Sequence, residues 1–123
     1  MAAMAILAVD ENLVALKELT ENLQATFPQD TITAFKDPLF ALQYAYNHPK
    51  EIRLVFSAIA MRHADGLELA KAIQKTSPGA ITFFTVETDS WELAAIARQY
   101  GGGVCIKKPV TVEKLQEATC FLY

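Results

Sequence analysis

Hydrophobic residues follow two alternating patterns along the chain. Nearly continuous apolar runs occupy residues 5–9, 52–56 and 81–85, and a shorter run occupies 104–106. Runs of this length predict strands, and their continuity is typical of a parallel sheet covered on both faces. Residues 31–35 alternate between polar and apolar, which predicts a half-buried strand near an edge of that sheet.

Between these runs, apolar residues recur every three or four positions, as they do on one face of a helix. The first series consists of Leu16, Leu19, Leu23 and Phe27, and Pro28 ends it. Four further helices are predicted over residues 37–48, 66–75, 89–100 and 111–122.

Polar residues mark where several of these helices begin. Asp37 before Pro38 is a typical helix start, and Thr111 is expected to cap the last helix. Asp89 with Glu92 three residues later fits a capping box for the fourth helix, which the glycine run 101–103 should end.

Strict alternation of five strands with five helices predicts an α/β fold. Right-handed crossovers then place helices on both faces of the sheet, which makes it doubly wound. The length of 123 residues fits one domain spanning 1–123. In such sheets the functional crevice lies at the carboxyl ends of the strands.

Composition narrows the function classes. The formal net charge of −3 argues against a nucleic-acid-binding surface, and no apolar run is long enough for a membrane helix. Cys105 and Cys120 lack the spacing of a metal site, and His48 and His63 have no partner at ligand spacing. We therefore expect two buried, reduced thiols and a cytoplasmic location.

Four polar residues are expected to meet at the carboxyl ends of the strands. Asp10 and Glu11 follow the first strand, Thr85 ends the fourth, and Lys108 follows the fifth. Each alone has an ordinary structural explanation, such as an acid near a helix start. Together they predict an acidic pocket in which Lys108 nearly neutralises both carboxylates and so holds the loops in one arrangement.

With these residues the chain resembles the receiver domains of two-component response regulators over nearly its whole length. Asp10 and Glu11 match the family's acidic pair, residues 61–69 its loop after the third strand, Thr85 its hydroxyl, and Lys108 its lysine before proline. That loop and the Lys-Pro-Val ending are most similar to receivers of LytTR-type regulators. The resemblance implies a flavodoxin-like sheet in the order 2-1-3-4-5 and a non-enzymatic role in phosphorelay signalling.

Three positions depart from the family pattern. The resemblance puts the phosphoacceptor at Ala58, whose methyl group cannot act as the nucleophile that takes a phosphoryl group. Val86 stands where the family has a small residue, and Cys105 where it has the aromatic ring of the switch. Three altered positions favour natural loss, although the sequence leaves open whether Ala58 is natural or engineered.

The same departure bears on cofactors. The resemblance implies a metal held by one acid of the pair, the phosphoacceptor and the carbonyl of Ala60. With Ala58 one oxygen ligand is missing, and magnesium needs several. We therefore expect no cofactor, or weak magnesium binding at most by Asp10 and Glu11.

These expectations leave three functions open. The leading one is a phosphorylation-independent protein-interaction or dimerisation module, using the surface of the fourth helix, fifth strand and fifth helix. Its partner is a second copy, a histidine kinase or an output domain after Tyr123, and Trp91 is either its anchor or packed on the domain edge. The alternative is a small-ligand sensor with a pocket near Asp10, Ala58 and Ala60. A conventional phosphorylatable receiver is the third.

Overall fold

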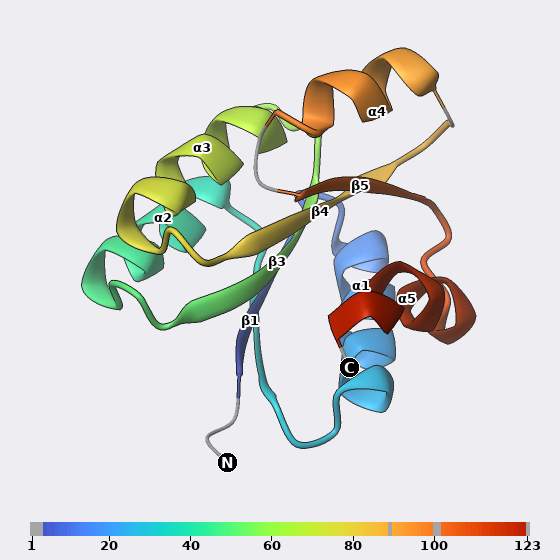
Figure 1. Ribbon diagram of the computed structural model, residues 1–123, viewed down its shortest axis with the longest axis horizontal. Helices are drawn as coiled ribbons and strands as arrows, with labels where there is room; N and C mark the ends of the chain where they lie inside the picture. Colours follow the sequence, from blue (N-terminus) through green and yellow to red (C-terminus); the bar gives the residue numbers. More distant parts are fainter. Residues whose placement is uncertain (1–3, 89, 100–101, 123) are drawn as a thin grey trace.

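The computed structural model describes residues 4–88, 90–99 and 102–122. Strands and helices alternate along the chain (Figure 1). They are β1 (Ala5–Val9), α1 (Leu13–Thr26), β2 (Thr31–Phe35), α2 (Pro38–Asn47), β3 (Ile52–Ala58), α3 (Gly66–Thr76), β4 (Ile81–Val86), α4 (Trp91–Ala97), β5 (Gly102–Lys107), α5 (Val112–Thr119) and a 3-10 turn, η1 (Cys120–Leu122).

The five strands form one parallel sheet in the order β2-β1-β3-β4-β5, which confirms the predicted topology. Helices α1 and α5 lie on one face of this sheet, and α2, α3 and α4 lie on the other (Figure 1). Because all strands run the same way, their carboxyl ends meet at one edge. We call this edge the rim.

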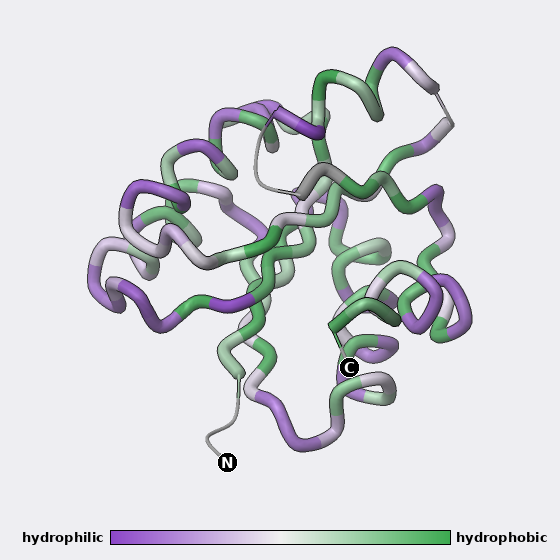
Figure 2. The backbone as a smooth tube through the Cα atoms, in the orientation of Figure 1, coloured by the Kyte–Doolittle hydropathy of each residue, from purple (hydrophilic) through white to green (hydrophobic). Residues whose placement is uncertain are grey.

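The core has a layer on each face of the sheet, since alternate side chains of a strand point to opposite faces. Toward α1 and α5, Phe56 stacks on Phe83 with ring centroids 4.7 Å apart. Toward α2 and α3, Leu7 and Val55 pack with Ile73. Residues of the central strands are accordingly mostly hydrophobic, and hydrophilic residues occur mainly in the loops and along the helices (Figure 2).

Most of the predicted helix starts are confirmed. The side chains of Asp37 and Thr111 cap α2 and α5 by accepting backbone hydrogen bonds, and Asp65 does the same for α3. Helix α4 differs: its cap is Ser90, which accepts from the amide of Leu93. The proposed cap at residue 89 lies outside the described residues.

Several element ends differ from the prediction. Helix α4 ends at Ala97, before the glycine run, and β5 begins at Gly102 because glycine's backbone still pairs with β4 beside a register shift. Strand β3 continues to Ala58, and α5 gives way to a 3-10 turn after Thr119. Cys120 in that turn is exposed, so the expectation of two buried thiols was wrong. None of the helices in the described ranges is long and apolar enough to span a bilayer.

Candidate functional site

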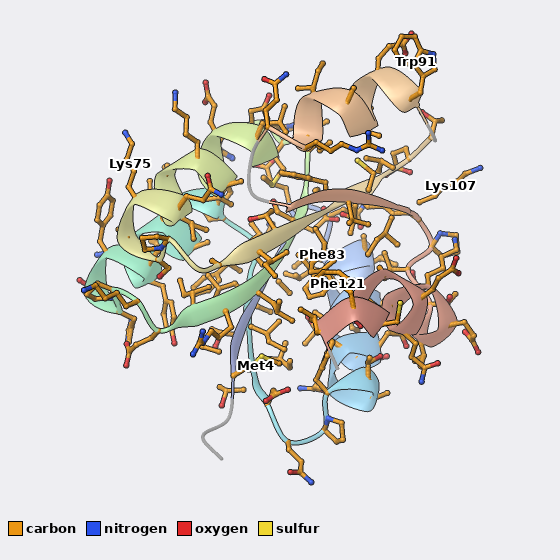
Figure 3. All side chains as sticks on the ribbon, viewed as in Figure 1. Met4, Lys75, Phe83, Trp91, Lys107 and Phe121 are labelled. Carbon is orange, nitrogen blue, oxygen red and sulfur yellow. The ribbon has the colours of Figure 1, made fainter. Side chains whose placement is uncertain are left out.

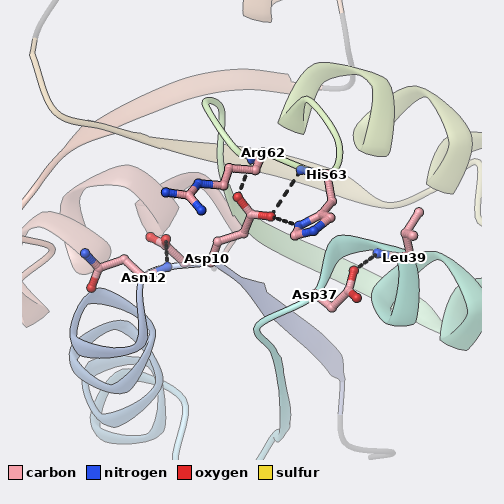
Figure 4. Close-up of polar contacts among 7 residues, drawn as sticks. Asp10, Asn12, Asp37, Leu39, Arg62 and His63 are labelled. Atoms are coloured by element: carbon pink, nitrogen blue, oxygen red, sulfur yellow. Dashed lines mark hydrogen bonds and ion pairs between the residues drawn. The ribbon is translucent and has the colours of Figure 1, made fainter.

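Asp10 is the most deeply placed charge of the rim. It follows β1, and only 4% of its surface is exposed. One carboxylate oxygen accepts a hydrogen bond from the amide of Asn12 at 2.9 Å (Figure 4), and the other lies 2.8 Å from the ammonium of Lys108. A buried carboxylate is tolerated when it is paired and hydrogen-bonded, and Asp10 is both.

Lys108 reaches Asp10 from the loop after β5. Its amide donates to the carbonyl of Val86 at 2.8 Å, which fixes the loop against the end of β4. Its ammonium also lies 3.3 Å from a carboxylate oxygen of Glu87. Partial burial by itself lowers the pKa of Lys108, but hydrogen bonds and charges from Asp10 and Glu87 outweigh it and raise the pKa above its usual value.

Glu11 turns away from Lys108 toward the loop between β3 and α3. Its carboxylate accepts hydrogen bonds from the amides of Arg62 and His63, and lies 2.5 Å from Nδ1 of His63 (Figure 4). The hydrogen bond from the Arg62 amide is the main cause that lowers the pKa of Glu11. Contacts with His63 add to it, against a smaller opposing effect of desolvation.

The acidic pair therefore separates, and the prediction that both carboxylates share Lys108 was wrong. Successive side chains leaving a strand point to opposite sides, so Asp10 and Glu11 meet different loops. Sequence reasoning also missed Glu87 as a partner of Lys108, and assigned no partner to His63, which contacts Glu11. The position of Glu87 directly after the fourth strand could have indicated this contact, because the carboxyl ends of parallel strands meet at one edge.

Ala58 and Thr85 are register neighbours at the ends of β3 and β4. Both are almost fully buried. The hydroxyl oxygen of Thr85 has no hydrogen-bond partner among the described residues. The predicted rim residues thus form three groups: Asp10 with Lys108, Glu11 with the β3–α3 loop, and a buried Ala58–Thr85 pair that supplies no carboxylate.

Gly66 fixes the far end of the β3–α3 loop. Its amide donates to the carbonyl of Ile59 at 2.8 Å. A Cβ atom at this position would lie 2.1 Å from the carbonyl oxygen of Ala58, so only glycine allows the close approach of the helix start to β3. The loop that carries Arg62 and His63 is therefore closed by a tight backbone contact.

A hollow of about 430 Å³ opens to solvent above this rim. Its lining includes Asp10, Ala60, Arg62, Glu87 and Lys108. Of the three residues expected near a pocket, Asp10 and Ala60 line this hollow. Ala58 lies beneath the surface and does not. Among the described residues, no three His, Cys, Asp or Glu side chains are placed to hold a metal ion.

The surface of α4, β5 and α5 carries a second group of predicted residues. Trp91 is 78% exposed and projects from the outer end of α4, so the alternative of packing on the domain edge was wrong (Figure 3). Cys105 packs under α4 beside Phe84 and Ala97. A groove of about 400 Å³ runs between β5 and α5, with Phe121 and Lys107 in its lining.

Comparisons with known proteins agree with this geometry. The family model of the response regulator receiver domain matches residues 6–119. Among solved structures, Vibrio cholerae chemotaxis protein CheY4 superposes with a TM-score of 0.84 at 19% identity, covering 99% of this chain and 100% of that one. Among curated proteins, none matches in sequence.

Two further solved structures give the same result. The receiver domain of an HD domain-containing protein from Pseudomonas fluorescens Pf-5 has a TM-score of 0.80 and 26% identity over 98% of this chain and 94% of that one. The response regulator DrrB of Thermotoga maritima, an OmpR/PhoB homologue, has a TM-score of 0.80 and 20% identity. The match covers 98% of this chain but 53% of DrrB.

Proposed function

The chain belongs to the response regulator receiver domain family, and from that premise we propose that it binds protein partners without being phosphorylated itself. The observation that carries the proposal is Ala58. It ends β3, where the family resemblance implies the phosphoacceptor, and its buried methyl group has no lone pair with which to attack phosphorus.

The arrangement around Ala58 supports the proposal. Here Lys108 is paired with Asp10 at 2.8 Å and with Glu87 at 3.3 Å. The two carboxylates compensate its charge, so the rim keeps one arrangement with no phosphoryl group present.

The same residues do not fit a tight magnesium site. Asp10 is paired with Lys108, the carboxylate of Glu11 is turned to Arg62 and His63, and position 58 supplies no oxygen. Magnesium takes octahedral oxygen ligands and gives up its waters reluctantly. We therefore expect no cofactor, or only weak magnesium binding, and we expect the domain to act in the cytoplasm.

We assign the interaction to the surface of α4, β5 and α5. Trp91 is 78% exposed, and tryptophan is enriched at binding hot spots. The groove between β5 and α5 lies at the same β5 edge of the sheet but on the opposite face from α4, and Phe121 is part of its lining. The partner class is another signalling protein: a histidine kinase, a C-terminal output domain or a second copy.

Acetyl phosphate with magnesium tests the proposal. The protein should gain no phosphoryl group by intact-mass measurement, and the fluorescence of Trp91, the single tryptophan of the sequence, should not change. The matched variant Ala58→Asp should gain one phosphoryl group that hydroxylamine removes. Stoichiometric, hydroxylamine-labile phosphate on the parent protein would overturn the proposal.

A small-ligand sensor remains the second candidate, because the hollow above the rim has a volume of about 430 Å³. It is open and lined by charges that already pair with one another, whereas small-molecule sites are usually enclosed and largely apolar. This function predicts that a small molecule raises the melting temperature of the parent, and that the Ala60→Trp variant, which fills the hollow, abolishes the shift.

A further inference from the structure

A second hollow opens at the rim, on the side toward β2. It has a volume of about 560 Å³ and is lined by Glu11, Asn12, Lys36, Asp37, Arg62 and His63. These residues follow β1 and β2 or lie in the loop between β3 and α3 (Figure 4). We call this space the β1–β2 hollow. Its volume lies within the roughly 300–1,000 Å³ that is usual for small-molecule sites.

The acids and the cations of the β1–β2 hollow are engaged differently. Glu11 accepts hydrogen bonds from the amides of Arg62 and His63. Asp37 uses one carboxylate oxygen to cap α2. Within the described ranges, the ammonium of Lys36 and the guanidinium of Arg62 have no hydrogen-bond or ion-pair partner. The formal charges of the hollow cancel, but the groups left free for a ligand include two cations.

The hollow above the rim has the opposite character. There the ammonium of Lys108 already lies 2.8 Å from a carboxylate oxygen of Asp10 and 3.3 Å from one of Glu87. An anion that entered it would compete with two carboxylates for one cation and would be repelled by both. In the β1–β2 hollow, an anion meets cations that no carboxylate of the described residues has paired. The β1–β2 hollow is therefore the better anion site of the two.

Both cations project from backbone that is held in place. Lys36 directly follows Phe35, whose carbonyl accepts a hydrogen bond from the amide of Asp10 at 3.2 Å. The amide of Arg62 donates to Glu11, whose carboxylate also contacts the next residue of the loop. The side chains of both cations are exposed, so their charged ends are open to a ligand. A site with a preformed backbone loses less conformational entropy when it binds.

The free groups determine the class of ligand. A guanidinium binds phosphate through two parallel hydrogen bonds, and an ammonium adds a second positive charge. Together, Lys36 and Arg62 match the two negative charges of a phosphate monoester above its second pKa of about 6. Among the described residues, the second carboxylate oxygen of Asp37 and the side-chain nitrogen of Asn12 have no partner. This acceptor and this donor suit the hydroxyl groups of a sugar.

We propose that the β1–β2 hollow binds the phosphate monoester of a hydroxyl-bearing small molecule, such as a sugar phosphate. Arg62 and Lys36 hold the phosphate, and Asp37 and Asn12 bind hydroxyl groups. The bound molecule bridges the start of α2 to the loop between β3 and α3. Binding is noncovalent and transfers no phosphoryl group, so the site does not need a carboxylate at Ala58.

This site goes beyond the proposed function and does not rest on it. Neither Ala58 nor Trp91 lines the β1–β2 hollow. Lys36 and Asp37 line this hollow and not the one above the rim. Signals from these two residues therefore distinguish the site from that of a small-ligand sensor above the rim.

Titration of the isotope-labelled full chain with ribose 5-phosphate at about pH 7.5, where the phosphate is dianionic, tests the inference. The amide chemical shifts of Lys36, Arg62 and His63 should change together and saturate. Those of Glu87 and Lys108 should not follow them. Ribose should cause no change, and inorganic phosphate should shift the same residues with lower affinity, because it lacks the hydroxyl groups of the sugar.

Variants separate the two cations from the overall charge of the protein. Lys36→Gln and Arg62→Gln should each weaken the binding of ribose 5-phosphate about tenfold, since each removes a charge-assisted hydrogen bond. Lys71→Gln, which removes an exposed lysine of α3, is the matched control and should bind like the parent. The amide spectrum of each variant also shows whether it is folded.

Four results would overturn the inference. The first is a parent whose amide shifts do not saturate with ribose 5-phosphate up to roughly 20 mM. The second is a set of shifts centred on Glu87 and Lys108 in place of Lys36. The third is unchanged affinity in both Lys36→Gln and Arg62→Gln. The fourth is equal affinity for inorganic phosphate, which would mean that the hydroxyl groups contribute nothing.

Discussion

Asp10 and Glu11 are adjacent in sequence, but they belong to two halves of the rim with different physical character. The inner half consists of Asp10, Glu87 and Lys108, and the side chains of Asp10 and Lys108 are largely buried there. The outer half consists of Glu11 with Arg62 and His63 on the β3–α3 loop. Here the side chain of His63 is 63% exposed, and that of Glu11 is 19% exposed.

This difference separates what each half contributes. Burial makes an unpaired charge costly, so the inner half holds β1, β4 and β5 in a fixed relation as long as its pairs are complete. The outer half gains little stability from the contact between Glu11 and His63, because solvent screens interactions near the surface. Its hydrogen bonds instead fix the position of the loop between β3 and α3 relative to the end of β1. The inner half therefore contributes to stability, and the outer half mainly positions the loop between β3 and α3.

The largest effect should come from the root of the outer loop. In Gly66→Ala the new methyl group would lie 2.1 Å from the carbonyl oxygen of Ala58, so helix α3 or β3 must shift. We expect the free energy of unfolding in urea to fall by about 3 kcal/mol. Gly79→Ala is the matched control: nothing lies within 4 Å, and stability should be unchanged or slightly higher. Equal effects at both glycines would contradict this account.

Removing the cation of the inner half should have the next largest effect. Lys108→Met leaves Asp10 buried with only the Asn12 amide, and we expect a loss of about 2 kcal/mol. This is below the cost for a fully buried pair because the Lys108 side chain is still 17% exposed. Asp10→Asn in the same chain should recover part of the loss. If the single variant unfolds at the same urea concentration as the parent, the inner half is no more structural than the outer.

The fold was predictable from the sequence because it depends on repeated, local patterns. The continuous apolar runs and the three-to-four spacing of Leu16, Leu19 and Leu23 are each sufficient to identify an element. Ends were less predictable. Strand β5 begins at Gly102, where no side chain reveals the pairing, and only the partner strand β4 decides it.

The sequence predicted which residues lie at the rim, but it did not predict which of them form ion pairs or hydrogen bonds with one another. Asp10, Glu11, Thr85 and Lys108 all lie at the rim, as parallel strands require. Which carboxylate meets Lys108 depends on the direction of each side chain where the chain leaves β1, and that direction is set by tertiary packing. The contact of His63 with Glu11 joins positions 52 residues apart, and sequence spacing contains no information about it.

The smallest expected effect is the pH dependence of the stability that each half contributes. It is also the most specific test of the comparison. The folded pKa of Lys108 is raised, so its stabilisation is complete below the unfolded pKa of about 10.4 and is lost as the pH rises through the folded value. The folded pKa of Glu11 is lowered, so its contribution is complete above the unfolded pKa of about 4.3 and is lost as the pH falls.

Differences between the parent and single variants isolate these two contributions from all other titrations. From pH 7 to 11, the stability difference between the parent and Lys108→Met should stay constant until about pH 10.4 and then shrink. From pH 7 to 3, the smaller difference between the parent and Glu11→Gln should shrink only below about pH 4.3. A difference for Lys108→Met that instead grows from about pH 9 would mean that burial outweighs the pull of Asp10 and Glu87 on Lys108, because a lowered folded pKa makes the parent more stable as the lysine loses its proton. Packing would then stabilise the inner half, and its ion pairs would contribute as little to stability as the contact between Glu11 and His63 in the outer half.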